Sequence, residues 1–442
     1  MSIAARKALT QRQGWLERLF HLSEYDTDVR TEISAGITTF MTMAYVMIVH
    51  PSIMAAAGMP VAEMAVVTAI TSGLFTLMMG LYANRPFALA PAMGSNVFFA
   101  STLVAGGIAT WQQALGMVFI SGMTFVALTV LGFREMIVKT IPKCIKVSIG
   151  AALGLFIAQL GMKNAGWMVA QGSLAIGDLT TPGAILAMIG FVIIAVMMSR
   201  GVKGALLWGI LLTSAIGIPM GVTQLPTKII SLPPSIAPIA FKLDILGTLK
   251  LSFVPAMFIF FTGDFFSTLG TVLGVGGKAG LLDENGDLPG IEKPFLVDAL
   301  GTVVGALLGT STVTTYVESA AGVEAGGRTG LTAVTTAVIF FLMLFLTPIA
   351  TIIPSEATAP ALVLIGLLML PAIKEVDFGD FTEALPAFVT ILFTAFTFNL
   401  ANGISLGVLT YVVIKVASGR RHEVPLGMYI LCLPLLYYLA TL

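Results

Sequence analysis

The sequence predicts an all-α protein that crosses a membrane many times. Of its 442 residues, 57% are hydrophobic and 10% are charged, whereas a soluble domain carries about 25% charged residues. Apolar runs of about 20 residues, the length of a membrane-spanning helix, recur from residue 33 to the end of the chain. The alternating pattern of membrane strands is absent, and a helix satisfies its backbone polar groups without water. A bundle of membrane helices is therefore expected.

The apolar segments divide into two sets of seven, which predicts an inverted repeat. The first repeat occupies residues 31–222, a proline-rich external connector follows at 223–250, and the second repeat occupies 251–418. Because seven is odd, the second set starts from the opposite side of the membrane. The fourteen expected spans are residues 33–56, 64–82, 91–104, 114–133, 147–161, 183–198 and 205–220, then 251–275, 295–308, 315–323, 331–349, 359–370, 385–398 and 404–416. The segment at 419–442, apolar from residue 426, has no assigned place.

Positive charges predict the orientation of the chain. Residues 1–30 lack a secretory hydrophobic core and form the expected cytosolic N-terminal segment; their basic residues are Arg6, Lys7, Arg12, Arg18 and Arg30. With that start, lysines and arginines concentrate in the loops that face the cytosol, and the outer loops hold few. We therefore expect a multi-pass protein of the plasma (inner) membrane.

Composition and motifs disfavour several other classes of protein. The net charge of zero gives no indication of nucleic-acid binding, and the histidines and cysteines lack metal-ligand or disulfide spacing. Phe261 stands where the Gly-x-Gly-Asp motif of intramembrane aspartyl proteases needs its first glycine. Val272 and Ala279 replace two required residues of a P-loop around Gly277-Lys278. Neither an enzyme activity nor a metal or cofactor is expected.

The third and tenth segments are interrupted in matching positions. Pro86 and Pro91 prevent a regular helix, so we expect a short extended piece at 87–90 and a half-helix that starts near Ser95 or Asn96. The tenth segment begins with β-branched residues that favour a strand, and a capping-box pattern of Thr315 with Glu318 predicts a short helix after it. Paired interruptions in opposite repeats indicate a binding site at the middle of the membrane.

Two acidic residues, Asp264 and Glu318, fall at membrane depth. A charge near the middle of a span costs about 2.5–3.5 kcal/mol on insertion scales, and acids kept there usually mark a substrate or proton pathway. A protonated or hydroxyl-paired Asp264 would instead brace helix packing, and a capping Glu318 would be a local brace. We favour a ligand role for both, and expect Asp298 and Glu324 to be interfacial or paired.

The first span carries polar residues whose expected role is structural. Glu32 lies at the positive end of the helix dipole. Thr38, Thr39, Thr42 and Tyr45 form a polar stripe suited to hydrogen bonds between helices.

Four segments of the chain together resemble a known family. They are residues 32–45, Phe-Ala-Leu-Ala-Pro at 87–91, Leu-Gly-Thr at 269–271, and Thr-Ser-Thr-Val-Thr-Thr-Tyr-Val-Glu-Ser at 310–319. They resemble the AzgA-like purine permeases of the nucleobase–cation symporter superfamily, which also holds the uracil and xanthine permeases. The resemblance implies fourteen spans in two inverted seven-helix repeats, arranged as a core and a gate domain, with short strands and half-helices in segments 3 and 10.

The resemblance also implies a function and site residues. It implies import of adenine, guanine or hypoxanthine together with protons. By motif position, Asp264 and Glu318 match the family's acidic binding residues, and Asn96 matches its asparagine in span three. The chain departs from the family where Ser267 replaces a frequent second aspartate.

A purine base suits such a site chemically. A carboxylate accepts hydrogen bonds from neighbouring N–H groups of the base, and a strand backbone serves its other edge. The aromatic rings that could stack on its face are Phe98, Phe265, Phe266 or Tyr316. The expected substrate-binding residues are Asp264, Glu318, Asn96, Phe98, Phe265, Thr315 and Tyr316. Because burial favours an uncharged carboxyl, Asp264 and Glu318 are also the candidates for proton coupling. We expect Glu318 to grip the base and Asp264 to contribute to coupling, with the reverse assignment open.

Other functions remain compatible with the sequence. A uracil, xanthine or anion transporter could use the same fold, and a passive channel or a receptor is a more distant alternative. Coupling to sodium instead of protons and assembly as a homodimer are also open.

Overall fold

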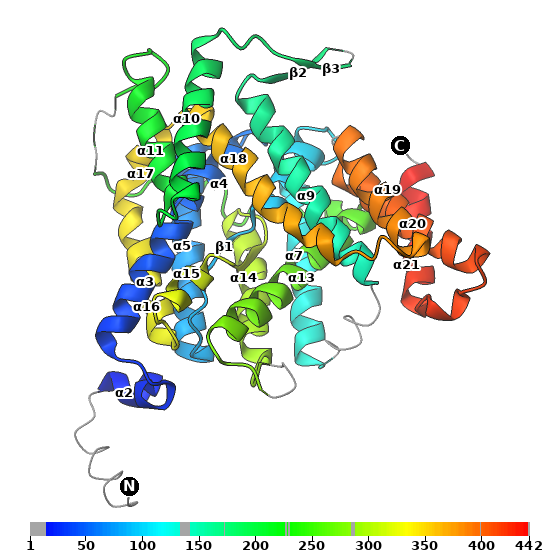
Figure 1. The fold of residues 1–442 in the computed structure, drawn as a ribbon, viewed down its shortest axis with the longest axis horizontal. Coiled ribbons are helices and arrows are strands. Elements are labelled where there is room, and N and C mark those ends of the chain that lie inside the picture. Colours follow the sequence, from blue (N-terminus) through cyan, green and yellow to red (C-terminus); the bar gives the residue numbers. More distant parts are fainter. Residues whose placement is uncertain are drawn as a thin grey trace, which may run out of the picture.

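The chain is mostly helical (Figure 1). The structure, a computed structural model, describes residues 15–132, 142–171, 173–225, 228, 230–283, 288–397 and 399–440. Arg6, Lys7 and Arg12 of the expected cytosolic segment lie outside the described residues. Within the described ranges, nine helices are long and apolar enough to cross a membrane, and four apolar helices are shorter. The prediction of a polytopic α-helical membrane protein is confirmed.

A helix stands at each of the fourteen predicted spans. The first half contains α3 (Val29–Met43), α4 (Val46–Ala55), α5 (Val61–Met78), α6 (Met93–Val97), α7 (Trp111–Val130), α9 (Lys143–Asn164), α10 (Pro182–Ser199) and α11 (Ala205–Gly217). The second half contains α13 (Val254–Lys278), α14 (Glu292–Leu308), α15 (Ser319–Glu324), α16 (Gly330–Leu342), α17 (Thr347–Ile352), α18 (Ser355–Met369), α19 (Phe381–Thr397) and α20 (Leu400–Ala417). Outside the spans lie α2 (Trp15–Phe20), the hairpin of β2 (Met168–Gln171) and β3 (Ser173–Ile176), and α12 (Ile245–Thr248) in the connector.

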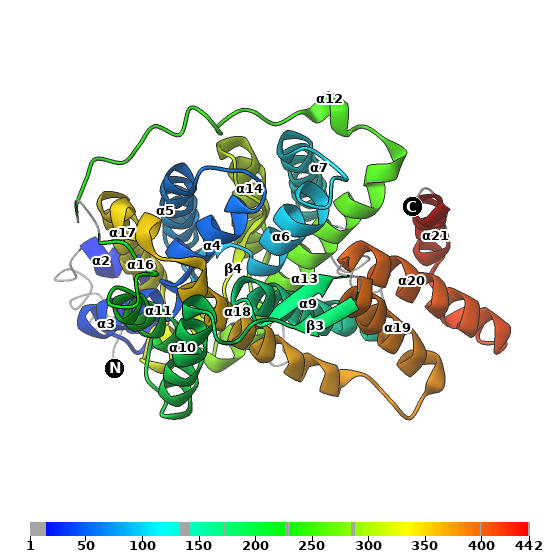
Figure 2. The ribbon, with the colours of Figure 1, turned by 90° about the horizontal axis from the view of Figure 1, so that it is seen from above.

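The helices pack in two groups, and within the first group the two halves of the chain make equivalent contacts. In the first group, α7 packs against α13 and α14, just as α16 packs against α3 and α5. In the second group, α9 packs against α18 and α19, and the pairs α10–α11 and α19–α20 lie at its two ends. Figure 2 shows this second group as a row along one side of the first. These groups correspond to the core and the gate, and the terms are used for them below.

A buried carboxylate joins the two halves of the core. The Glu32 side chain, on the first turn of α3, is fully buried. It accepts hydrogen bonds from the backbone N–H groups of Arg328 at 2.8 Å and Thr332 at 3.1 Å, and from the Thr332 hydroxyl at 2.6 Å. The free N–H groups at the start of a helix attract a negative charge. Glu32 therefore caps α16 across the core, in addition to lying at the start of its own helix.

The last apolar segment, which follows the fourteen predicted spans, forms helix α21 (Leu426–Ala440), and this helix packs against α20 and α13. An ion cluster fastens the turn before it. The Lys415 ammonium, whose side chain is fully buried, lies 2.9 Å from Glu383 and 2.7 Å from Glu423. The Arg420 guanidinium bonds Glu423 and Asp380, both at 2.6 Å. These charges connect the start of α19, the end of α20 and the turn that leads into α21.

Glu423→Gln should lower the thermal stability of the protein at neutral pH. Hydrogen bonds from Arg420 and Lys415 lower the pKa of Glu423 from 4.5 to about 2. A lowered pKa means that the charged form stabilises the fold above the unfolded pKa, and that this contribution disappears as the pH falls through the folded pKa. The difference in Tm from the wild type should therefore be largest above pH 4.5 and shrink toward pH 2.

Thermal unfolding of the purified protein in detergent measures this effect. Glu375→Gln is the matched control, because Glu375 makes an exposed pair with Lys143 at 3.1 Å, and such pairs contribute little stability. Equal Tm values for Glu423→Gln and Glu375→Gln at neutral pH would contradict the role of the cluster.

Candidate functional site

The two interrupted segments meet inside the core. Strands β1 (Leu89–Pro91) and β4 (Val313–Thr315) pair antiparallel, with Leu89 opposite Thr315 and Pro91 opposite Val313. Backbone bonds extend the pairing beyond both strands, from Ala92 N to Thr312 O and from Tyr316 N to Ala88 O, each at 2.9 Å. Short helices follow each strand. The prediction of short strands and half-helices in segments 3 and 10 is confirmed.

A cavity of about 340 Å³ lies beside this pairing, between the core and the gate. Its core side is formed by the start of α6, by β4 with the residues after it, and by one face of α13, and its gate side by α9 and α18. The lining residues are Tyr45, Ala92, Met93, Gly94, Ser95, Lys146, Ile149, Gly150, Leu153, Thr262, Gly263, Phe266, Ser267, Thr271, Thr314, Thr315, Tyr316, Val317, Glu318, Ile365, Leu368 and Met369. A mostly apolar wall with a few polar groups is typical of small-molecule sites.

Glu318 is the acidic residue that lines the cavity. It occupies the position just before α15 and is half-buried. Its Oε1 accepts a hydrogen bond from the Tyr45 hydroxyl at 2.7 Å, and its carbonyl oxygen accepts one from the Thr42 hydroxyl at 3.4 Å. The turn between α3 and α4 in the first span, which contains Tyr45, therefore orients the carboxylate.

The predicted capping box of Thr315 with Glu318 is wrong. Thr315 is still part of β4, and both its N–H and its hydroxyl donate to Asp298 Oδ1 at 2.7 Å. The helix starts only at Ser319, and the Glu318 side chain makes no capping bond. The strand pairing holds Thr315 in an extended conformation, so the helix cannot begin there. Glu318 is consequently available to a ligand in the cavity.

Tyr316 and Thr315 also line the cavity, and each is held in place by hydrogen bonds. The Tyr316 hydroxyl donates to the Pro91 carbonyl oxygen at 2.5 Å, which ties the residue after β4 to the end of β1. The hydroxyl and N–H of Thr315 are directed at Asp298, as described above. A ligand would therefore meet a preformed wall on the core side.

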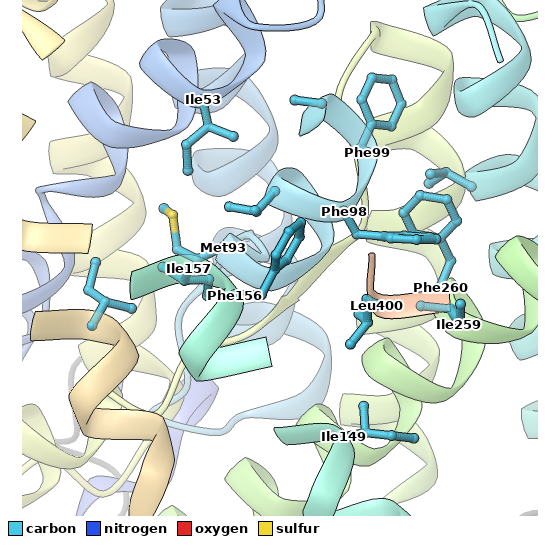
Figure 3. Close-up of a cluster of buried hydrophobic side chains, with 14 of the residues drawn as sticks. Ile53, Met93, Phe98, Phe99, Ile149, Phe156, Ile157, Ile259, Phe260 and Leu400 are labelled. Atoms are coloured by element: carbon cyan, nitrogen blue, oxygen red, sulfur yellow. The ribbon is translucent and has the colours of Figure 1, made fainter. Parts of the chain in front are cut away.

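Four of the predicted binding residues do not line the cavity. Asp264 is turned toward α14, where the Thr302 hydroxyl donates to its Oδ2 at 2.6 Å. Asn96 is fully buried and accepts a hydrogen bond from the Ser311 hydroxyl, so it braces the two interrupted segments. Phe98 packs edge-on against Phe260, with ring centroids 5.2 Å apart. Figure 3 shows both side chains within a cluster of buried hydrophobic residues.

Phe265 is the fourth of these residues. Its ring packs against Phe125 and Phe295, with centroid distances of 5.3 and 5.5 Å, and it is almost fully buried. The neighbouring Phe266 lines the cavity instead. One residue along a helix changes the direction of a side chain by about 100°, and the sequence alone does not determine which of two adjacent phenylalanines faces a ligand.

The lining residues that were not predicted as site residues include Tyr45 and Lys146. Tyr45 was assigned to hydrogen bonding between helices, and its bond to Glu318 is of that kind, but it lies in the cavity wall. Lys146 lies just before the predicted start of the fifth span, whereas α9 begins at Lys143. Its Nζ lies 4.7 Å from the centroid of the Phe266 ring. The cavity therefore has an acid on its core side and a base on its gate side.

A core that contains the paired strands, a gate packed against it and a cavity between the two groups define a membrane transporter. A family model described as the Permease family matches residues 30–406, and the chain belongs to this xanthine/uracil permease family.

Relatives of known name align along almost the whole chain. A permease of Methanocaldococcus jannaschii is 46% identical, over 94% of this chain and 96% of its own. The adenine permease AdeQ of Escherichia coli is 41% identical, over 95% of this chain and 94% of its own. The guanine/hypoxanthine permease PbuO of Bacillus subtilis is 38% identical, over 92% and 96%.

Solved structures show the same fold at low sequence identity. The transmembrane domain of the cyanobacterial bicarbonate transporter BicA superposes with a TM-score of 0.61 at 17% identity, and covers 88% of this chain and 97% of that domain. The murine anion transporter Slc26a9 in its inward-facing state superposes with a TM-score of 0.62 at 11% identity, over 88% and 68%.

Ser267→Cys should react with a water-soluble maleimide, and Thr268→Cys should not, in a background that lacks Cys144 and Cys432. Ser267 is exposed and lines the cavity. Thr268 is fully buried, and its hydroxyl lies 2.9 Å from that of Thr314. Mass spectrometry of labelled membranes measures both rates. Equal labelling of the two variants would contradict the position of the cavity.

Proposed function

We propose that the protein is a secondary active transporter that imports a purine nucleobase by proton symport. Adenine, guanine and hypoxanthine are the candidate substrates, because relatives that align over almost the whole chain are named adenine permease and guanine/hypoxanthine permease. The observation that carries the proposal is the position of Glu318 in the cavity, oriented by Tyr45.

The chemistry of the cavity wall suits a flat, neutral base. Glu318 accepts hydrogen bonds from the N–H groups on one edge of a purine, and a charged acceptor makes such bonds stronger than a neutral one. Tyr316 and Phe266 offer aromatic faces on the core side. A cavity of about 340 Å³ is at the small end of ligand sites, as expected for a single base.

The same observation weighs against an anion as substrate. A carboxylate in the wall repels an anion, and this effect is strong where water is excluded. The fold similarity to bicarbonate and other anion transporters concerns the backbone alone. Uracil and xanthine carry N–H groups like those of the purines, so they remain the competing substrates that an uptake experiment must include.

The location of the cavity supports alternating access. Its walls come from the core and from the gate, so movement of one group against the other would open the cavity to one side at a time. We place the protein in the plasma membrane with a cytosolic N-terminus, on the basis of the loop charges.

Uptake of labelled adenine, guanine, hypoxanthine and uracil by cells that express the protein tests the proposal. A purine should accumulate, and a protonophore should abolish the accumulation. Accumulation that the protonophore leaves unchanged would contradict proton symport, and transport of uracil in preference to every purine would contradict the assigned substrate.

Glu318→Gln should reduce purine uptake at low substrate concentration by about tenfold to a hundredfold. A hydrogen bond to a charged group contributes about 1.5–3 kcal/mol, and each 1.4 kcal/mol is about a factor of ten. Glu63→Gln is the matched control, because Glu63 lies in the first turn of α5 and does not line the cavity. Full uptake by Glu318→Gln would contradict the assignment of Glu318 to the substrate site.

A further inference from the structure

Lys146 is the one cation in the part of the cavity wall that the structure describes. It lies in the first turn of α9, on the gate, and Ile149, Gly150 and Leu153 continue the lining at helical spacing along the same face. The ammonium group therefore reaches the cavity from the side opposite the strands and Glu318. The proposed function leaves this charge without a role.

The ammonium group connects the gate with the core through an aromatic ring. The Lys146 Nζ lies 4.7 Å from the centroid of the Phe266 ring on α13, which lines the cavity as well. A cation over the face of a ring is attracted by its π electrons, and the same face suits the stacking of a flat base. A base that stacks on Phe266 takes the place of the ammonium group, which then lies at an edge of the base.

The cavity has room for a planar group beside these two side chains. Gly150 on α9 and Gly263 on α13 both line it, and a Cβ atom added to either glycine would enter open space. Gly150 lies one turn after Lys146, and Gly263 lies nearly one turn before Phe266. The absence of both side chains therefore leaves space for a base next to the ammonium group and the ring.

Several hydroxyl groups of the wall are already used within the protein. Four of them donate to other protein atoms, namely those of Tyr45, Thr262, Thr315 and Tyr316. An ammonium group carries three N–H donors and no acceptor, and a charged donor makes stronger hydrogen bonds than a neutral one. Lys146 is therefore the strongest donor for a substrate acceptor that faces the gate.

A purine base suits a cavity with an acid on one side and a base on the other. Adenine, guanine and hypoxanthine all carry N–H donors, which suit Glu318, and all keep one acceptor nitrogen in the five-membered ring. Lysine is a common partner of this nitrogen in guanine where proteins read DNA, and adenine presents the same acceptor. Uracil has no five-membered ring.

We infer that Lys146 is a substrate-binding residue, and that its ammonium group donates a hydrogen bond to the acceptor nitrogen in the five-membered ring of a purine. The inference rests on the proposed function and deepens it, because it assigns the contact that recognises the second ring. The bound base then joins Glu318 on the core to Lys146 on the gate. The site is complete only while the two groups face each other across the base.

Purine analogues that lack this nitrogen test the inference together with Lys146→Met. The 7-deaza and 9-deaza isomers of guanine and adenine replace one ring nitrogen by C–H, so an N–H remains and the acceptor is lost. Each should bind to the wild type about tenfold to a hundredfold more weakly than its parent base, because a hydrogen bond to a charged group is lost. In Lys146→Met the parent base should lose the same factor, and at least one isomer should bind as tightly as its parent. Calorimetric titration in detergent measures these affinities.

Lys143→Met is the matched control, because Lys143 lies nearly one turn earlier on α9 and makes an exposed ion pair with Glu375. It should keep the wild-type affinities. Lys146→Arg should keep the difference between each base and its analogues, since a guanidinium group also donates hydrogen bonds. If both isomers keep their full wild-type loss of affinity in Lys146→Met, the inference is overturned.

Chemical modification of the wild type gives a readout that needs no variant. Saturating guanine or adenine should slow the reductive methylation of Lys146 and leave that of Lys143 unchanged, and mass spectrometry of the digested protein measures both rates. Equal rates at Lys146 with and without a base that binds would overturn the inference and leave purine transport standing. Absence of binding by every purine would instead refute the proposed function, and the inference with it.

Discussion

The structure depends on the pairing of two three-residue strands in the interior of a helical membrane protein. Water cannot satisfy backbone groups at that depth, so each N–H and C=O needs an internal partner. Proline at position 91 has no N–H to offer, and its carbonyl oxygen receives the Tyr316 hydroxyl and the Asn96 amide. Side chains therefore complete the hydrogen bonding that the strands cannot complete themselves. Several conspicuous polar residues of the sequence are used for this purpose.

The need to satisfy the strand backbone also explains why the polar lining of the cavity comes mainly from the core. The core already concentrates hydroxyls, carboxyls and exposed backbone around the strands, and it contributes most of the polar lining, including Tyr45, Thr315 and Glu318. The gate contributes mainly small and apolar residues, with Lys146 as its charged exception. In the proposed function the core would therefore provide most of the substrate recognition, while the gate presents a surface with few hydrogen-bonding groups. Such an interface suits two bodies that move past each other.

The sequence was informative where a physical constraint acts on a whole segment. Apolar length locates each span. Two closely spaced prolines locate the first interruption, because each removes a helix hydrogen bond, and β-branched residues locate the second, because strands favour them. The sequence was less informative about the direction in which each side chain points. Membrane depth alone assigns Asp264 to a ligand site, whereas in the structure its carboxyl group accepts a hydrogen bond from Thr302. Thr315 fits a capping pattern, but pairing with a distant strand overrides that local preference.

Contacts between helices determine the other side-chain positions that the sequence left open. The partners of Asn96 and Phe98 lie on segments distant in the sequence, and no local pattern distinguishes a bracing asparagine or a packed phenylalanine from one that faces a ligand. Asp298 was expected to be interfacial or paired. Its partners, Thr315 and Asp264, become visible only once α13, α14 and β4 are brought together.

The long separation between the paired strands has a consequence for biosynthesis. The Ala88 N–H bonds to the Ser319 hydroxyl, 231 positions later in the chain. While the ribosome is still making the second half, the third segment has emerged without the strand that will satisfy its backbone. Until then, its backbone needs water or the insertion machinery as a hydrogen-bonding partner. The third segment therefore reaches its final position, and the cavity forms, only after the tenth segment has been made.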